Sequence, residues 1–213
     1  MPTEGGRWIT AIADHNATAR IETWEAFLES SRSLITPTLY NALRYARPPD
    51  GIRHYRFPVS TWKHFEQLPR FPRGVLPIAD AFCRFNPIHG QGMSSAALQA
   101  RMLQGVLYRA ATEQDPIAAA QAGFMTEVAS VLETPWTMST SADLAFPQTR
   151  GERPDNFTEA RELEAALFRA AVADPVVHRA MIEVAQLLQP HQRLREPDIT
   201  RRIEAASVVQ AAA

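Results

Sequence analysis

The stretch at residues 80–93, DAFCRFNPIHGQGM, contains the residue types of this chain that are best suited to hold a ligand. Asp80 follows a short apolar run, VLPIA, and its carboxylate can accept hydrogen bonds from hydroxyl groups. Further along, Gly90-Gln91-Gly92 opens a segment rich in Ala and Leu that is predicted to be a helix. Helix starts expose N–H groups and partial positive charge, and glycine lets a ligand approach the backbone closely. The pattern therefore suits an electron-rich ligand with hydroxyl groups, such as a nucleotide cofactor.

A second interpretation stays open, because a Gly-Gln-Gly helix start is a weak motif and a tight loop without a ligand explains it about as well. The other reactive residues add little. Cys83 is most simply an inert thiol, and His89 is expected to face solvent rather than a ligand. The histidines show no spacing typical of a metal site, so none is predicted. Four aromatic residues could line a substrate pocket, although core packing is the commoner role: Trp8, Tyr55, Phe57 and Trp62.

The elements that must position this stretch follow from the spacing of apolar residues. Strands are predicted at residues 7–13, 52–57 and 75–79, although Pro77 places the last of them at a strand start or a sheet edge. Asp80 would then lie at the carboxyl end of a buried strand, where layered α/β proteins bind ligands. Helices are predicted at residues 19–34, 38–45, 91–111, 117–132, 160–172 and 176–188, with a last one beyond Pro197.

The helix predicted at residues 91–111 has the clearest apolar pattern of the chain. One of its faces carries Met93, Ala97, Ala100, Leu103 and Leu107. This spacing is typical of an amphipathic helix.

The motif resembles that of a known family. Asp80-Ala81, Pro87 and Gly90-Gln91-Gly92 are spaced like the second flavin-contacting motif of FAD-dependent aromatic hydroxylases of the para-hydroxybenzoate hydroxylase type. That motif reads roughly Gly-Asp-Ala, then Pro, then Gly-Gln-Gly before a long helix. The surrounding segment, RGVLPIADAFCRFNPIHGQGMSSAALQA, most resembles a bacterial subgroup, and the similarity extends over nearly the whole chain.

The resemblance implies a cofactor and a reaction. The residue matching Asp80 hydrogen-bonds the ribityl chain of FAD, the one matching Pro87 lies close to the isoalloxazine, and the backbone from Gly90 to Met93 approaches the flavin ring. The implied cofactor-binding residues are therefore Asp80, Pro87, Gly90, Gln91, Gly92 and Met93. The implied enzyme is a monooxygenase that oxidises an organic substrate, aromatic or isoprenoid, with O2 and NAD(P)H. Such chemistry belongs mainly to the cofactor, so no catalytic side chain is predicted.

The chain also departs from the family pattern. Ala79 stands where the family has glycine, and Ser94 and Gln99 replace the Asn and Asp of many relatives. The Gly-x-Gly-x-x-Gly turn that holds the ADP half of FAD does not occur in the sequence, since Gly5-Gly6 has no third partner. The chain therefore looks like the C-terminal part of such an enzyme.

The expected fold class is α/β, or α+β in this shorter form. Residues 1–72 would be a remnant of the substrate-binding sheet, residues 73–112 an FAD-contacting strand, loop and helix, and residues 113–213 a helical C-terminal region. Besides the organic substrate, the expected partners are a missing N-terminal half or a second copy of the chain. The alternative to an enzyme is a non-catalytic remnant, or a helical interaction module that needs a separately encoded N-terminal half.

Composition favours an ordinary globular protein. The chain has 213 residues, a net charge of −1 and 46% hydrophobic residues. The chain lacks the excess of basic residues that is typical of nucleic-acid-binding proteins. No apolar stretch approaches the roughly 20 residues of a membrane-spanning helix. The start, MPTEGGRW, does not read as a signal peptide, and a single cysteine suits a reducing compartment. The predicted location is the cytoplasm.

Overall fold

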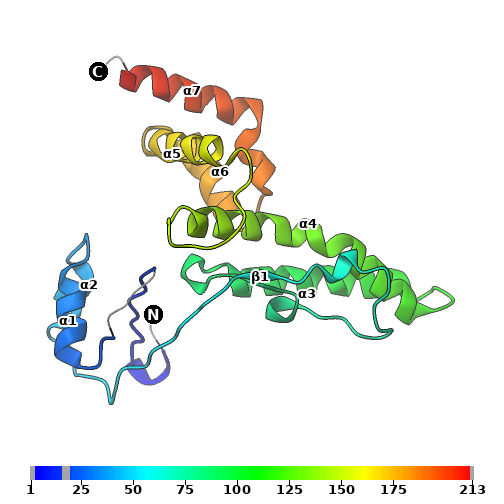
Figure 1. The fold of residues 1–213 in the computed structure, drawn as a ribbon, viewed down its shortest axis with the longest axis horizontal. Coiled ribbons are helices and arrows are strands. Elements are labelled where there is room, and N and C mark those ends of the chain that lie inside the picture. Colours follow the sequence, from blue (N-terminus) through cyan, green and yellow to red (C-terminus); the bar gives the residue numbers. More distant parts are fainter. Residues whose placement is uncertain (1–2, 16–19, 212–213) are drawn as a thin grey trace. The chain divides into compact units, whose positions relative to one another are not determined.

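The computed structural model describes residues 3–15 and 20–211 (Figure 1). The chain divides into two compact units, residues 1–56 and residues 57–213. The three segments expected from the sequence were defined by their functions, so the division into compact units neither supports nor contradicts them.

The first unit contains α1 (Trp24–Arg32) and α2 (Thr38–Leu43), which pack against each other. The Oγ1 atom of Thr23 accepts a hydrogen bond from the Ala26 N–H at 3.1 Å and caps the start of α1. Phe27 and Leu43 are the buried apolar residues of these two helices.

The second unit is built around the pair α3 (Gln91–Ala110) and α4 (Pro116–Leu144), which lie side by side (Figure 1). Their core contains Phe82, Val106, Phe124 and Leu132. A Cβ atom on Gly123 would lie 3.0 Å from a methyl carbon of Val106, so the glycine allows the two helices to approach closely.

A proline lies inside α4. Pro135 is buried, and it has no backbone N–H to donate to the carbonyl four residues earlier. The helix nevertheless continues for nine residues beyond it, to Leu144. One hydrogen bond of the α4 ladder is therefore missing about two-thirds of the way along the helix.

The C-terminal part of the second unit contains α5 (Phe157–Ala173), α6 (Pro175–Ala185) and α7 (Pro197–Ala211). Its core includes Leu167, Val177 and Ile199 from the three helices. Asp174 joins two of them, because its carboxylate accepts the Val176 N–H at the start of α6 and pairs with Arg202 of α7, both at 2.8 Å.

The predicted α/β fold class is wrong, because the described chain is mostly helical. Its only sheet is a pair of two-residue strands, β1 (Thr61–Trp62) and β2 (Cys83–Arg84), which run antiparallel. The segments at residues 7–13 and 52–57 form no strand. Residues that favour strands form a sheet only where neighbouring strands offer hydrogen bonds, and the segment at residues 7–13 makes no more than an isolated bridge at Trp8.

The expected strand at residues 75–79 is also not formed. The segment begins beside α4, where Gln121 Nε2 donates hydrogen bonds to the carbonyls of Pro72 at 2.7 Å and Val75 at 2.9 Å, and it ends at Ala79 in a left-handed conformation. The Val75 carbonyl therefore bonds to a glutamine side chain and not to a neighbouring strand. Asp80 consequently lies in a 3-10 turn, Ala79–Ala81, and not at the end of a sheet strand.

No helix among the described residues is long and apolar enough to cross a membrane.

Candidate functional site

The start of α3 is shaped by Gly90. A 3-10 turn, Pro87–His89, ends where the Gly90 N–H donates to the Pro87 carbonyl at 3.1 Å. The φ angle of Gly90 is +68°, a left-handed conformation that residues with a side chain rarely adopt. A Cβ atom added at Gly90 or at Gly92 would meet no atom within 4 Å. A ligand can therefore reach the first backbone N–H groups of α3.

Two other helices of this unit, α4 and α6, have their positive ends covered by a carboxylate, whereas α5 has no side-chain cap, like α3. Asp115 accepts the Ala118 N–H at the start of α4, and this hydrogen bond lowers the pKa of its carboxyl below the usual value. Asp174 caps α6 through Val176, and its pKa is lowered mainly by the hydrogen bond from Arg202. At the start of α3 no side chain accepts a hydrogen bond from the backbone. The partial positive charge there is left to solvent or a ligand.

Asp80 lies on the surface, and its carboxylate makes no hydrogen bond or ion pair with the described residues. Its turn is held against α3 by the Ala79 N–H, which donates to Gln99 Oε1 at 2.9 Å. Gln99 lies nine residues beyond Gly90 in the sequence, or about 13 Å along the helix axis at 1.5 Å per residue.

Of the other residues of the motif, Gln91 packs inside the protein, whereas Pro87 and Met93 lie on its surface. The side chain of Gln91 is buried, and its Nε2 donates to the Ala185 carbonyl at the end of α6 at 2.9 Å. This side chain therefore anchors α3, and only its backbone is open to a ligand. Pro87 is exposed, and Met93 is 83% exposed on the outer surface of α3.

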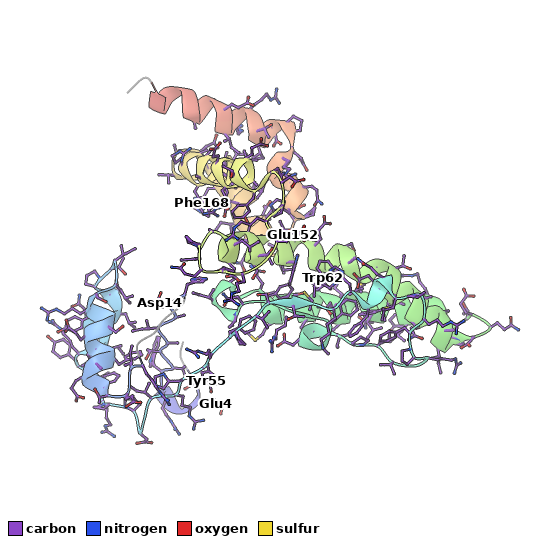
Figure 2. All side chains as sticks on the ribbon, in the orientation of Figure 1. Glu4, Asp14, Tyr55, Trp62, Glu152 and Phe168 are labelled. Atoms are coloured by element: carbon purple, nitrogen blue, oxygen red, sulfur yellow. The ribbon has the colours of Figure 1, made fainter. Side chains whose placement is uncertain are left out.

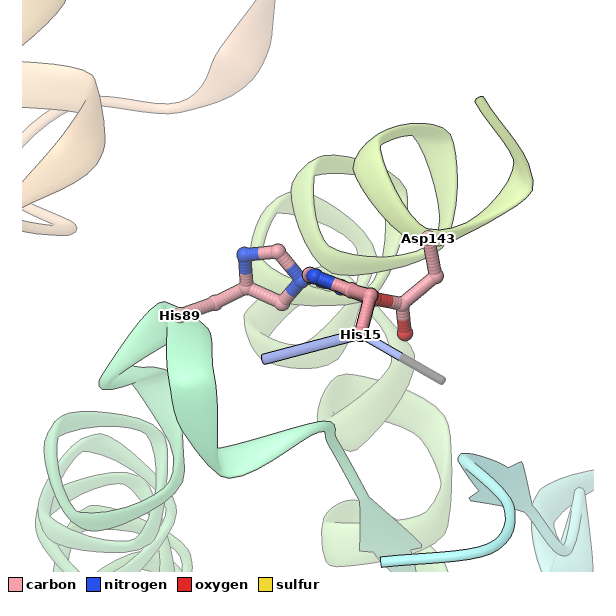
Figure 3. A group of neighbouring side chains, drawn as sticks. All are labelled: His15, His89 and Asp143. Carbon is pink, nitrogen blue, oxygen red and sulfur yellow. Dashed lines mark hydrogen bonds and ion pairs between the residues drawn. The ribbon is translucent and has the colours of Figure 1, made fainter. Parts of the chain in front are cut away.

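His89 does not simply face solvent, as the sequence suggested. Its Nε2 lies 2.9 Å from Asp143 Oδ1 in the last turn of α4, and the two side chains point toward each other in Figure 3. Asn86 Nδ2 donates to the same carboxylate oxygen at 2.8 Å, while its own Oδ1 accepts the Ile88 N–H at 3.2 Å. The loop before α3 is thus fastened to the end of α4.

No signal in the sequence pointed to Asp143. It lies 54 residues beyond His89, outside any motif, and its partners are known only once the loop and α4 have been placed. His89 and Asp143 are residue types that also bind metal ions, so the absence of a metal site stays a prediction.

Cys83 is buried in the core of the second unit. Burial, followed by the nearby carboxylates of Glu66 and Asp80, raises the pKa of its thiol to about 12. The thiol is therefore protonated at neutral pH and is a poor nucleophile.

Of the aromatic residues considered for a pocket, Trp62 is a packing residue. Its ring, labelled in Figure 2, lies in the second unit; it stacks on His64 at 4.5 Å and meets Trp136 edge-on at 5.7 Å. Phe57 packs under the guanidinium of Arg84, 5.0 Å from the ring centre. Trp8 and Tyr55 are exposed. These positions give no support to an aromatic substrate pocket.

A groove of about 480 Å³ lies between α3, α4 and the segment after α6. Its lining includes the apolar residues Leu98, Met102 and Val131 and the charged residues Arg101 and Arg109. None of the predicted cofactor-binding residues lines it. The groove is therefore separate from the start of α3.

Comparison with known proteins shows that the chain is similar in sequence to part of a longer protein. It is similar to "Protein Rv3254" of Mycobacterium tuberculosis, with 28% identity over 226 aligned residues. The alignment covers 93% of this chain and 47% of the relative, so the chain spans about half the length of the protein it matches. No protein-family model matches the chain.

Proposed function

We propose that this chain supplies the part of an FAD-dependent monooxygenase that contacts the flavin ring and the ribityl chain. The complete enzyme would oxidise an organic substrate, aromatic or isoprenoid, with O2 and NAD(P)H. The observation that carries the proposal is the open start of α3 at Gly90 and Gly92, which lies within the motif that resembles the flavin-contacting motif of that family.

The described residues fit such a cofactor in two respects. The carboxylate of Asp80 has no partner within the described chain and can accept hydrogen bonds from ribityl hydroxyls. The first N–H groups of α3, with the helix dipole behind them, favour a ligand that carries negative charge.

Bound FAD would supply the redox chemistry of the reaction. The residues of this chain would bind and orient it. Asp80 would fix the hydroxyl-bearing chain, and the backbone at Gly90–Gly92 would stabilise negative charge on the ring. Gln91 and the Asn86–His89–Asp143 contacts would keep the loop and the helix start in place.

The test is the visible absorption spectrum of the purified chain, before and after it is incubated with FAD and freed from unbound cofactor. The proposal predicts a retained flavin spectrum, and at least a tenfold weaker FAD affinity in Asp80→Ala. Asp155→Ala, at an exposed carboxylate away from the motif, is the matched control and should bind FAD normally. Equal FAD affinity in Asp80→Ala and in the original chain would refute the assignment of Asp80.

A second candidate function is that of a helical interaction module without catalytic activity, which needs a separately encoded N-terminal half. The length of Rv3254, about twice the matched part, favours the need for a further half of polypeptide. A chain that stays colourless in FAD, whether alone or together with that half, would support the module and exclude the flavoprotein.

A further inference from the structure

The groove between α3, α4 and the segment after α6 has the size of a small-molecule site. Its volume of about 480 Å³ lies within the range of roughly 300–1,000 Å³ that is usual for such sites. Six apolar residues contribute to its lining: Leu98, Met102, Val131, Leu187, Leu188 and Pro190. None of the residues assigned to the cofactor lines it, so its ligand is a question separate from the proposed function.

The wall of the groove formed by residues 187–190 is fastened at both ends. Before it, the Ala185 carbonyl accepts the hydrogen bond from Gln91 Nε2 at 2.9 Å. After it, the His191 N–H donates to Thr134 Oγ1 at 3.1 Å. These bonds join the segment to α3 and α4, so the groove is formed without a ligand, as most small-molecule sites are.

Leu187 lines this wall in a strained conformation. Its φ angle is +57°, in the left-handed region that glycine normally occupies after a helix end. Glycine at this position would relieve the strain, but the groove would then lose an apolar side chain. Strained residues of this kind tend to lie at ligand sites, so the conformation of Leu187 favours a groove that is used for binding.

Gly105 keeps space open in the part of the lining that α3 provides. A Cβ atom at this position would lie 3.4 Å from Nη1 of Arg109, at the end of a flexible side chain. The guanidinium of Arg109 pairs with Glu127 of α4, so its charge is already compensated. The groove is therefore open beside this ion pair.

Arg101 gives the groove a positive charge that the described chain does not neutralise. Arg101 is exposed, and it makes no hydrogen bond or ion pair with the described residues. The other charged residues among the described lining, Arg109 and Glu127, pair with each other. The lining therefore carries one net positive charge, which suits a ligand with one negative charge.

Thr134 lies at the same level of the groove as Arg101. The helices α3 and α4 are joined by the short loop at residues 111–115 and run antiparallel. Counted from the Arg109–Glu127 pair, Arg101 lies about 12 Å back along α3, at 1.5 Å per residue. Thr134 lies about 11 Å further along α4 by the same count. An anionic group in the groove can therefore lie between the two side chains.

The hydroxyl group of Thr134 is able to donate to such an anion. Thr134 is only 7% exposed, and its Oγ1 accepts the His191 N–H. The hydroxyl hydrogen has no acceptor among the described residues. A buried donor that is not used costs free energy, so a ligand that accepts this hydrogen bond would be favoured.

We propose that the groove binds a straight-chain fatty acid, with its carboxylate between Arg101 and Thr134 and its alkyl chain on the apolar lining beside Gly105. A guanidinium and a hydroxyl group are donors that a carboxylate accepts, and the guanidinium also compensates its charge. A phosphate monoester would bring a second negative charge, for which the described lining has no further free cation. The roughly 11–12 Å between the two polar ends of the groove suits a chain of medium length, such as that of decanoate.

The test is isothermal titration calorimetry of the full chain with decanoate, below the concentration at which decanoate forms micelles. We expect one saturable site, and at least tenfold weaker binding of decanol, which has the same chain length and no charge. Arg101→Gln should weaken decanoate binding at least tenfold. Arg169→Gln, at an exposed arginine of α5 outside the groove, is the matched control and should bind decanoate normally. No saturable binding, or equal affinity in Arg101→Gln and in the original chain, would overturn the proposal.

A second variant fills the groove without removing charge. In Gly105→Leu the new side chain occupies the space beside the Arg109–Glu127 pair, and leucine favours a helix more than glycine does. The helical circular dichroism should therefore be kept while decanoate binding is lost. Gln104→Leu, at the neighbouring exposed position outside this groove, should bind decanoate normally. Undiminished binding in Gly105→Leu would show that the acid binds elsewhere.

This inference does not rest on the proposed function, and the two can fail separately. Decanoate binding by a chain that never gains a flavin spectrum would uphold the fatty-acid site and count against the flavoprotein. A retained flavin spectrum without decanoate binding would do the reverse.

Discussion

The side chain of Gln99 joins the turn that carries Asp80 to the middle of α3. Its Oε1 accepts the Ala79 N–H at 2.9 Å, and its Nε2 donates to Ser95 Oγ at 3.2 Å. Gln99 and Ser95 are fully buried, so water cannot replace either partner. One buried amide therefore sets where the Asp80 turn lies relative to the helix.

We expect Gln99→Ala to lower the free energy of unfolding by about 1–3 kcal/mol, because the Ala79 N–H and the Ser95 hydroxyl lose a buried partner. Urea denaturation followed by circular dichroism measures the change. Gln104→Ala, at an exposed position of the same helix, should change the free energy of unfolding by less than about 0.5 kcal/mol. Similar losses in the two variants would contradict a special role for the Gln99 amide.

Ala79→Gly should raise the free energy of unfolding by up to about 1 kcal/mol. The φ angle of Ala79 is +51°, a left-handed conformation in which a Cβ atom costs about 1–2 kcal/mol. The greater freedom of glycine in the unfolded chain offsets part of this gain. Thermal and urea unfolding measure the change.

The control for this substitution lies two residues away. Ala81 belongs to the same turn and has no positive φ angle, so Ala81→Gly should destabilise the chain by about 0.5–1 kcal/mol. Substitutions with the same sign of effect at both positions would show that strain at Ala79 is not the cause.

The contact between His89 and Asp143 should appear as a coupling energy of about 1 kcal/mol in a double-mutant cycle of His89→Ala and Asp143→Ala. The side chains are only 20% and 14% exposed, so solvent screens the pair weakly. His178, exposed on α6, serves as the control partner, and His178→Ala should be additive with Asp143→Ala. A cycle that is additive for His89 as well would mean that the contact does not stabilise the loop.

Cys83 should resist alkylation in the folded chain at pH 8 and react after unfolding in urea. The pKa of about 12 leaves almost no thiolate, and the side chain is 1% exposed. Mass spectrometry of the iodoacetamide-treated chain measures this. Because the pKa of the folded chain is raised above the usual thiol value of 9.0, the stability that this group contributes is fully present below pH 9 and is lost as the pH rises toward 12. Rapid labelling of the native chain at pH 8 would contradict the buried position.

The helices could be predicted from the sequence because apolar spacing, caps and prolines are local signals. The helix expected at residues 91–111 is observed at Gln91–Ala110, and the Asp174-Pro175 pair begins α6. The strands could not be predicted in the same way, because a strand depends on a partner that is distant in the sequence. The segment at residues 75–79 has the composition of a strand and still forms none.

The candidate site was predictable only in its local part. The left-handed glycine at the start of α3 lies where the motif indicated. Whether a helix face packs or is exposed is decided by what lies next to it, so the apolar spacing of Met93, Ala97 and Ala100 could not reveal that this face is outward. The contact of His89 with Asp143 likewise depends on how α4 packs and had no sequence signal.

The proline in α4 bears on how firmly this site is held. Without the hydrogen bond that Pro135 cannot donate, the last turns of α4 can unravel separately from the part that packs on α3. Asp143 belongs to these last turns, so their opening would release the loop at Asn86 and His89 while the α3–α4 core stays folded. Amide hydrogen exchange after Pro135 should consequently be faster than in the longer part of α4 before it, and the start of α3 would open as often as this helix end rather than as rarely as the core.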